Sequence, residues 1–150
     1  MAPRPGFALR AGTLVATLGL LFATPGQAQD AEGGAAQIGL ELNKLESQGE
    51  SCRAYMVFEN ATPHRFDAYA LDLVIFDTEE MIANRLRVRL EDLRANKTVV
   101  RLFDIPETRC ESVGRILLNK IAACEVADGG AVDCLGLTRT RSRARVDFVQ

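Results

Sequence analysis

The chain has 150 residues and a formal net charge of −2, contains no tryptophan, and a quarter of its residues are charged. This length corresponds to one domain, and the slight acidity excludes a general attraction to nucleic acid or to an acidic membrane surface. An anion-binding site therefore requires a local cluster of basic side chains.

The N-terminal segment predicts a cleavable export signal. Arg4 and Arg10 form a positive region, residues 11–23 are apolar and uncharged, and Gly26-Gln27-Ala28 places small residues before a cleavage point. An apolar run this short cannot cross a bilayer core of about 30 Å, so a transmembrane anchor is not expected. No Arg-Arg pair precedes the run, which favours the general secretion route. We expect residues 1–28 to be removed, which takes the net charge to about −4 because Arg4 and Arg10 leave.

The rest of the chain is dominated by a strand-like period of two. Residues 29–37 are small and polar and predict a flexible lead-in to a single domain over residues 38–150. Alternating apolar and polar side chains predict strands at 38–43, 52–59, 68–77 and 85–90. Further strands are predicted at 97–105, which is β-branched and apolar, at 115–124, which is largely apolar, and at 143–149, which ends the chain. About seven short strands separated by turns predict an all-β fold, an Ig-like antiparallel β-sandwich.

Two segments of this pattern also contain good helix formers. Alternation between Arg85 and Leu90 favours a strand within residues 80–95, whereas strand or helix stays open for residues 110–124.

Four cysteines, Cys52, Cys110, Cys124 and Cys134, lie in the predicted domain. An even number in a small exported domain predicts two disulfides, with three pairings allowed. We favour Cys52–Cys110, which ties an early strand to a late one, and Cys124–Cys134, whose short loop contains Asp128-Gly129-Gly130 and doubles back easily. The alternative, a zinc site, usually uses close CxxC pairs, and the sequence has none.

Several segments of the predicted domain carry a resemblance. They are IGLELNKLE at 38–46, CRAY at 52–55, EN at 59–60, LDLVIFD at 71–77, FDI at 103–105, GRILLN at 114–119 and CLGL at 134–137. These segments resemble a family of small exported alphaproteobacterial proteins that are often labelled as Tat pathway signal sequence domain proteins. The resemblance implies a periplasmic protein and brings no activity, substrate or catalytic residue. This chain departs from the label because it has no paired arginines before the apolar run.

The most suggestive pattern is a repeat of arginine at every second residue. We call Arg85, Arg87 and Arg89 the 85–89 ladder, and Arg139, Arg141, Arg143 and Arg145 the 139–145 ladder. On strands, a period of two places each set on one face, where guanidinium groups bind phosphates or carboxylates with forked hydrogen bonds. The alternative is a solvated sheet face on which the arginines pair with acidic residues of neighbouring strands, such as Glu41, Glu91 or Asp92.

Other chemistry-bearing residues give weaker signals. His64 is the only histidine, no Gly-x-Ser-x-Gly elbow accompanies it, and we expect it to be exposed in a loop. An acidic stretch contains Asp67, Asp72, Asp77, Glu79 and Glu80. Because it lacks the glycine and the alternating ligands of a calcium-binding loop, we expect a solvated turn there. The sequons Asn60-Ala61-Thr62 and Asn96-Lys97-Thr98 are read as turn residues.

Together these observations predict a non-enzymatic periplasmic binding or accessory domain without a metal or cofactor. Its expected partner is an envelope protein or an acidic glycan, and the scarcity of aromatic residues argues further against nucleic acid. A polyanion-binding module, with lipopolysaccharide or an acidic glycan held by the two ladders, is the first alternative. A small hydrolase that uses His64 is the second.

Overall fold

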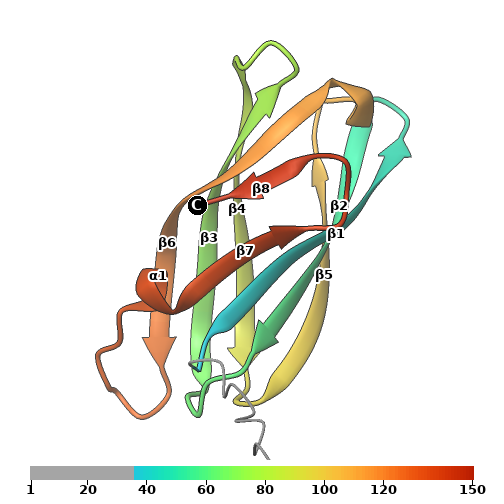
Figure 1. The fold of residues 1–150 in the computed structure, drawn as a ribbon. Coiled ribbons are helices and arrows are strands. Elements are labelled where there is room, and N and C mark those ends of the chain that lie inside the picture. The colour runs from blue at the N-terminus through green and yellow to red at the C-terminus, as the bar shows by residue number, and fades with distance from the viewer. Residues whose placement is uncertain (1–35) are drawn as a thin grey trace, which may run out of the picture. The chain divides into compact units, whose positions relative to one another are not determined.

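The computed structural model describes residues 36–150, and the predicted signal peptide at 1–28 lies outside the described residues. Two four-stranded sheets pack together (Figure 1). Sheet A has the order β5 (Lys97–Ile105), β2 (Ser51–Asn60), β1 (Ile38–Gln48), β7 (Thr138–Ser142). Sheet B has the order β4 (Ile82–Leu93), β3 (Phe66–Asp77), β6 (Val113–Val126), β8 (Asp147–Val149). Short helical turns, η1 (Cys110–Ser112) and α1 (Cys134–Leu137), precede β6 and β7.

Alternate side chains of both sheets form the core, as the period of two in the sequence predicts. Its largest fully buried members are Tyr69, Phe58, Phe66, Ile38, Leu40, Leu42, Met56, Leu71, Leu73, Ile75, Leu90 and Leu93. The buried Tyr69 hydroxyl shares a 2.6 Å hydrogen bond with the Thr138 hydroxyl, and burial raises the pKa of Tyr69 to about 12. The predicted β-sandwich is confirmed.

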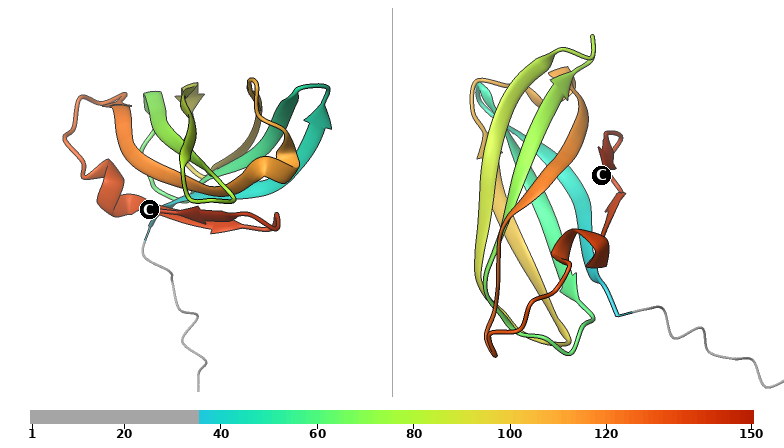
Figure 2. Two further views of the ribbon diagram at one scale, coloured as in Figure 1. Left: turned by 90° about the horizontal axis from the view of Figure 1, so that it is seen from above. Right: turned by 90° about the vertical axis from the view of Figure 1, so that its left-hand side faces the viewer.

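The C-terminal part differs from the prediction. The expected strand over residues 143–149 is wrong for its first half, because residues 143–146 form a turn and only Asp147–Val149 is β8. The preceding strand, β7, pairs in parallel with β1, and β8 pairs in parallel with β6, so both sheets are mixed. Figure 2 shows these two strands running beside one another along one side of the sandwich. The Ser142 hydroxyl donates to the Val146 carbonyl at 2.6 Å and fixes the turn between them.

The structure assigns the two segments that also contain good helix formers. Residues 80–95 contain the long strand β4, as the alternation between Arg85 and Leu90 indicated. Residues 110–124, for which sequence left strand or helix open, form one turn of 3-10 helix followed by β6.

Both predicted disulfides are confirmed. Cys52–Cys110 links β2 to η1, and Cys124–Cys134 links β6 to α1. Two disulfides indicate an oxidising environment outside the cytoplasm. Within residues 36–150, no helix has the length and apolar character needed to cross a membrane.

Candidate functional site

The 139–145 ladder is broken by the turn after β7. Arg139 and Arg141 lie on β7, whereas Arg143 and Arg145 lie in the turn. Arg141 Nε donates to Glu41 Oε2 at 2.7 Å, and Arg143 Nε donates to the same oxygen at 3.1 Å. Arg139 donates to the backbone carbonyls of residues 136 and 138, at 2.7 Å each. Arg141 and Arg143 therefore hold β7 and its turn against β1, whereas the hydrogen bonds of Arg139 stay within the residues just before it.

Glu41 is the centre of this network. Its side chain lies on β1 directly opposite Arg141 and is only 6% exposed. Asn43 Nδ2 donates to Glu41 Oε1 at 2.9 Å. Hydrogen bonds from Asn43, Arg141 and Arg143 lower the pKa of Glu41 from 4.5 to about 2. The sequence-based expectation that Glu41 pairs with ladder arginines is correct for the 139–145 ladder.

The 85–89 ladder keeps its strand geometry. Arg85, Arg87 and Arg89 are exposed on the outer face of β4 and alternate with core-facing leucine and valine side chains. Arg85 forms a bidentate pair with Asp72 of β3, with Nε to Oδ1 at 3.0 Å and Nη2 to Oδ2 at 2.8 Å. No ion pair of Arg87 or Arg89 is found among the described residues.

A β-bulge adds a fourth cation to this face. The register between β3 and β6 passes from Leu73 opposite Leu118 to Asp72 opposite Lys120, so Asn119 is the extra residue. Lys120 is therefore exposed on the outer face, with Asp72 between it and Arg87 across the three strands.

Asp72 is almost fully buried, and the surrounding cations stabilise its charge. The hydrogen bond from Arg85 lowers the pKa of Asp72 most, and the charges of Arg85, Lys120 and Arg87 lower it further. We call Arg85, Arg87, Arg89 and Lys120 around Asp72 the basic patch. Part of it lines a shallow hollow of about 300 Å³. The forked hydrogen bonds of Arg85 occupy the Asp72 carboxylate at the centre of the patch, and the exposed Glu91 follows Arg89 on the same face of β4.

The structure does not bring the two ladders together. β4 is the edge strand of sheet B, and β7 is the edge strand of sheet A on the side of the sandwich where β7 and β8 meet. Nothing in the sequence pattern identified Lys120 or Asp72 as neighbours of the 85–89 ladder. Only the order of the strands and the bulge at Asn119 reveal them.

Two other candidates, His64 and Asp77, lie in or next to turns. His64 is half-buried rather than fully exposed, and its ring lies edge-on to Phe66 with centroids 6.4 Å apart. Its carbonyl accepts a 2.8 Å hydrogen bond from Asn60 Nδ2, so the first sequon is a buried turn. Asp77 caps a turn by accepting from the backbone N–H groups of Glu79 and Met81 at 2.9 Å each. Residues 36–150 contain no cluster of three metal-ligating side chains.

No protein-family model and no curated protein sequence matches this chain. Among solved structures, the chain is similar to IrmA from Escherichia coli, with a TM-score of 0.52 and 14% identical residues. The similarity covers 70% of this chain and 91% of IrmA. At this identity the likeness shows the fold alone. The resemblance to exported alphaproteobacterial proteins stays a prediction.

Proposed function

We propose that this protein is a non-enzymatic binding domain of the bacterial periplasm, and that its basic patch binds a polyanion such as lipopolysaccharide or an acidic glycan. One observation carries the proposal. Arg87, Arg89 and Lys120 share one exposed face, and none of them forms an ion pair within residues 36–150. Exposed cations without protein partners are free to bind phosphate or carboxylate groups.

The geometry of β4 suits a repeating anionic ligand. Same-face residues of a strand are about 7 Å apart, since the rise is about 3.4 Å per residue. The arginines of the 85–89 ladder therefore form a row that can contact successive anionic groups.

A periplasmic setting is supported by two observations of different kinds. The disulfides fit an oxidising compartment, and the predicted signal peptide fits export by the general secretion route. The alternative of a hydrolase that uses His64 has less support, because the His64 ring packs against Phe66 inside a loop built around Asn60.

The test is binding of purified lipopolysaccharide to the oxidised protein, measured at increasing salt. The variant Arg87→Ser/Arg89→Ser removes two cations of the basic patch. The matched control Lys97→Ser/Arg101→Ser removes two exposed cations of β5, in the other sheet. We expect the patch variant to lose at least about tenfold in affinity, since each charge-assisted hydrogen bond contributes roughly 1.5–3 kcal/mol. The control should stay close to the wild type.

Two results would count against the proposal. Equal losses of lipopolysaccharide affinity in the patch variant and in the control would mean that binding depends only on the overall charge of the protein. Retention of a discrete envelope protein at moderate salt, by the wild type and by both variants, would instead favour an accessory role.

A further inference from the structure

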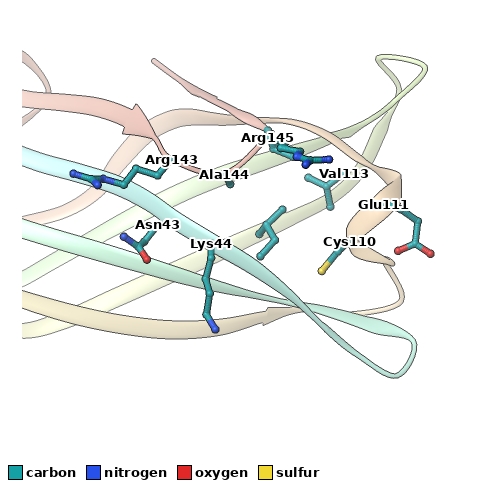
Figure 3. A pocket seen from close by; sticks show the side chains of 10 residues that line it. Asn43, Lys44, Cys110, Glu111, Val113, Arg143, Ala144 and Arg145 are labelled. Carbon is teal, nitrogen blue, oxygen red and sulfur yellow. The ribbon is translucent and has the colours of Figure 1, made fainter.

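A second hollow lies where β1, η1 and the turn between β7 and β8 meet (Figure 3). Its volume is about 470 Å³, within the range of roughly 300–1,000 Å³ that small-molecule sites occupy. A bulge in β1 helps to form it, because the register skips Asn43 between Leu42 and Lys44. The backbone N–H of Arg143 donates to the Leu42 carbonyl at 2.8 Å and holds the turn beside the bulge.

The floor of this hollow is apolar. Its side chains are Leu45, Cys110, Val113, Ala144 and Val146, all of which belong to the core cluster or pack against it. The disulfide from Cys52 to Cys110 anchors η1 to β2 at this floor. The floor is therefore continuous with the core and still open at its mouth, so an apolar ligand would cover it favourably.

The rim is basic, and its cations differ in how far they are already paired. Lys44 Nζ is bound to Glu46 at 2.6 Å and lies over the Tyr55 ring, so its charge is committed elsewhere. Arg143 donates to Glu41 through Nε. Arg145 forms no ion pair within the described part of the chain. Glu111 supplies the one carboxylate among the lining residues.

We propose that this hollow binds an acyl chain with an anionic head group, the chain against the apolar floor and the head group beside Arg145. An apolar floor with a basic rim matches both ends of such a ligand. A free fatty acid and the acyl chain of an acidic lipid share this chemistry. The site uses no residue of the basic patch, and dodecanoate has a single anionic group, so its binding tests the hollow separately from polyanion binding by the patch.

The first test is titration of the oxidised protein with dodecanoate, kept below its micelle concentration and followed by the NMR shifts of backbone amides. Dodecyltrimethylammonium, with the same chain and the opposite charge, is the matched ligand. We expect saturable dodecanoate binding, with shifts centred on Leu45, Val113 and Val146, and at least tenfold weaker binding of the ammonium compound. Equal binding of both ligands, or no saturable binding of dodecanoate, overturns the proposal.

Exposed charges allow tests with little risk to the fold. Arg145→Glu should weaken dodecanoate binding at least tenfold, and Glu111→Gln should strengthen it two- to threefold because it removes the one carboxylate of the lining. Arg101→Glu, on β5, is the control and should change nothing. If Arg145→Glu behaves like Arg101→Glu, the head-group site is wrong.

A further variant tests the floor, and a vesicle experiment assigns the source of the ligand. Ala144→Phe fills the hollow and should abolish dodecanoate binding. Dispersed NMR signals must verify that the variant folds, and retained affinity in a folded variant contradicts the proposal.

Phosphatidylglycerol vesicles that bind in an Arg145-dependent way identify a lipid as the ligand, whereas Arg145-dependent binding of dodecanoate alone identifies a free fatty acid. Binding of neither overturns the site.

Discussion

The two arginine ladders have the same period in the sequence and opposite environments in the structure. The 139–145 ladder meets Glu41 and Glu59 across sheet A, and Arg139, Arg141 and Arg143 are bound to carboxylates or carbonyls of the protein, whereas Arg145 forms no ion pair among the described residues. The 85–89 ladder meets Asp72 across sheet B, and only Arg85 is bound to it. The cross-strand neighbours therefore decide whether a row of arginines stabilises the fold or stays available to a ligand.

Register alone does not explain this difference, because Arg87 lies directly opposite Asp72 just as Arg141 lies opposite Glu41. The Asp72 carboxylate is held instead by Arg85, which leaves Arg87 without an ion pair among the described residues. On sheet A, Arg141 lies directly opposite Glu41, and the turn brings Arg143 to the same carboxylate. On sheet B, Arg89 lies opposite Ala70, and Asp72 lies between Arg87 and Lys120. Each ladder has one buried carboxylate beside it. The bulge that places Lys120 beside Asp72 adds a positive charge next to the 85–89 ladder only.

The largest expected effect on stability comes from Glu41→Gln. This change leaves Arg141 and Arg143 without their shared carboxylate and should lower the free energy of unfolding by about 1–3 kcal/mol. Urea unfolding at pH 7 measures the loss, with Glu91→Gln, an exposed residue of β4, as the control. A loss no larger than that of the control would mean that the 139–145 ladder does not hold β7.

Acid should weaken the same network. The pKa of Glu41 is about 2 in the folded protein and 4.5 as its ordinary value, so its contribution is complete above about pH 4.5 and is lost as the pH falls towards 2. Glu41→Gln removes this titration, so its stability should fall less steeply than that of the wild type between pH 4.5 and 2. Urea midpoints across this range provide the comparison, and identical slopes would contradict the assignment.

On the other sheet, Asp72→Asn should affect binding more than stability. It releases Arg85 and removes the one carboxylate of the basic patch, so affinity for lipopolysaccharide should rise by a few fold. The unfolding free energy should fall by about 1 kcal/mol, because Asp72 loses one exposed ion-pair partner, whereas Glu41 loses two. A loss of binding in the folded variant would show that the ligand does not use the charge of the patch.

The smallest expected effect is on the stability of Arg87→Ser/Arg89→Ser. Both side chains are exposed and form no ion pair among the described residues, so the free energy of unfolding should change by no more than about 0.5 kcal/mol for each. Thermal unfolding measures it. A larger loss of unfolding free energy would mean that Arg87 and Arg89 stabilise the fold, as we expect for Arg141 and Arg143.

Sequence predicted the parts of the fold that depend on local patterns. β2 follows from alternation, β5 from its β-branched and apolar residues, and the disulfide Cys124–Cys134 from a short, glycine-containing loop. β7 was not predicted because only Thr138 of its five residues is buried. Parallel pairing with β1 and ion pairs from β1 and β2 hold β7 in place, and these contacts are distant in sequence.

The candidate site was only half predicted for the same reason. The period of two correctly grouped Arg85, Arg87 and Arg89 on one face. It also extended the other ladder through Arg143 and Arg145, where a turn interrupts the strand. Lys120 was missed because the bulge at Asn119 changes which residues of β6 face outward, and a bulge depends on pairing between strands rather than on local sequence.

The most direct test compares two double variants, one from each ladder, for lipopolysaccharide affinity and unfolding free energy in the same samples. Arg87→Ser/Arg89→Ser should lose at least about tenfold in affinity and keep its stability. Arg139→Ser/Arg141→Ser should lose stability and keep its affinity where it remains folded. The opposite pattern, or the same loss of affinity in both, would contradict the division between a structural ladder and a binding ladder.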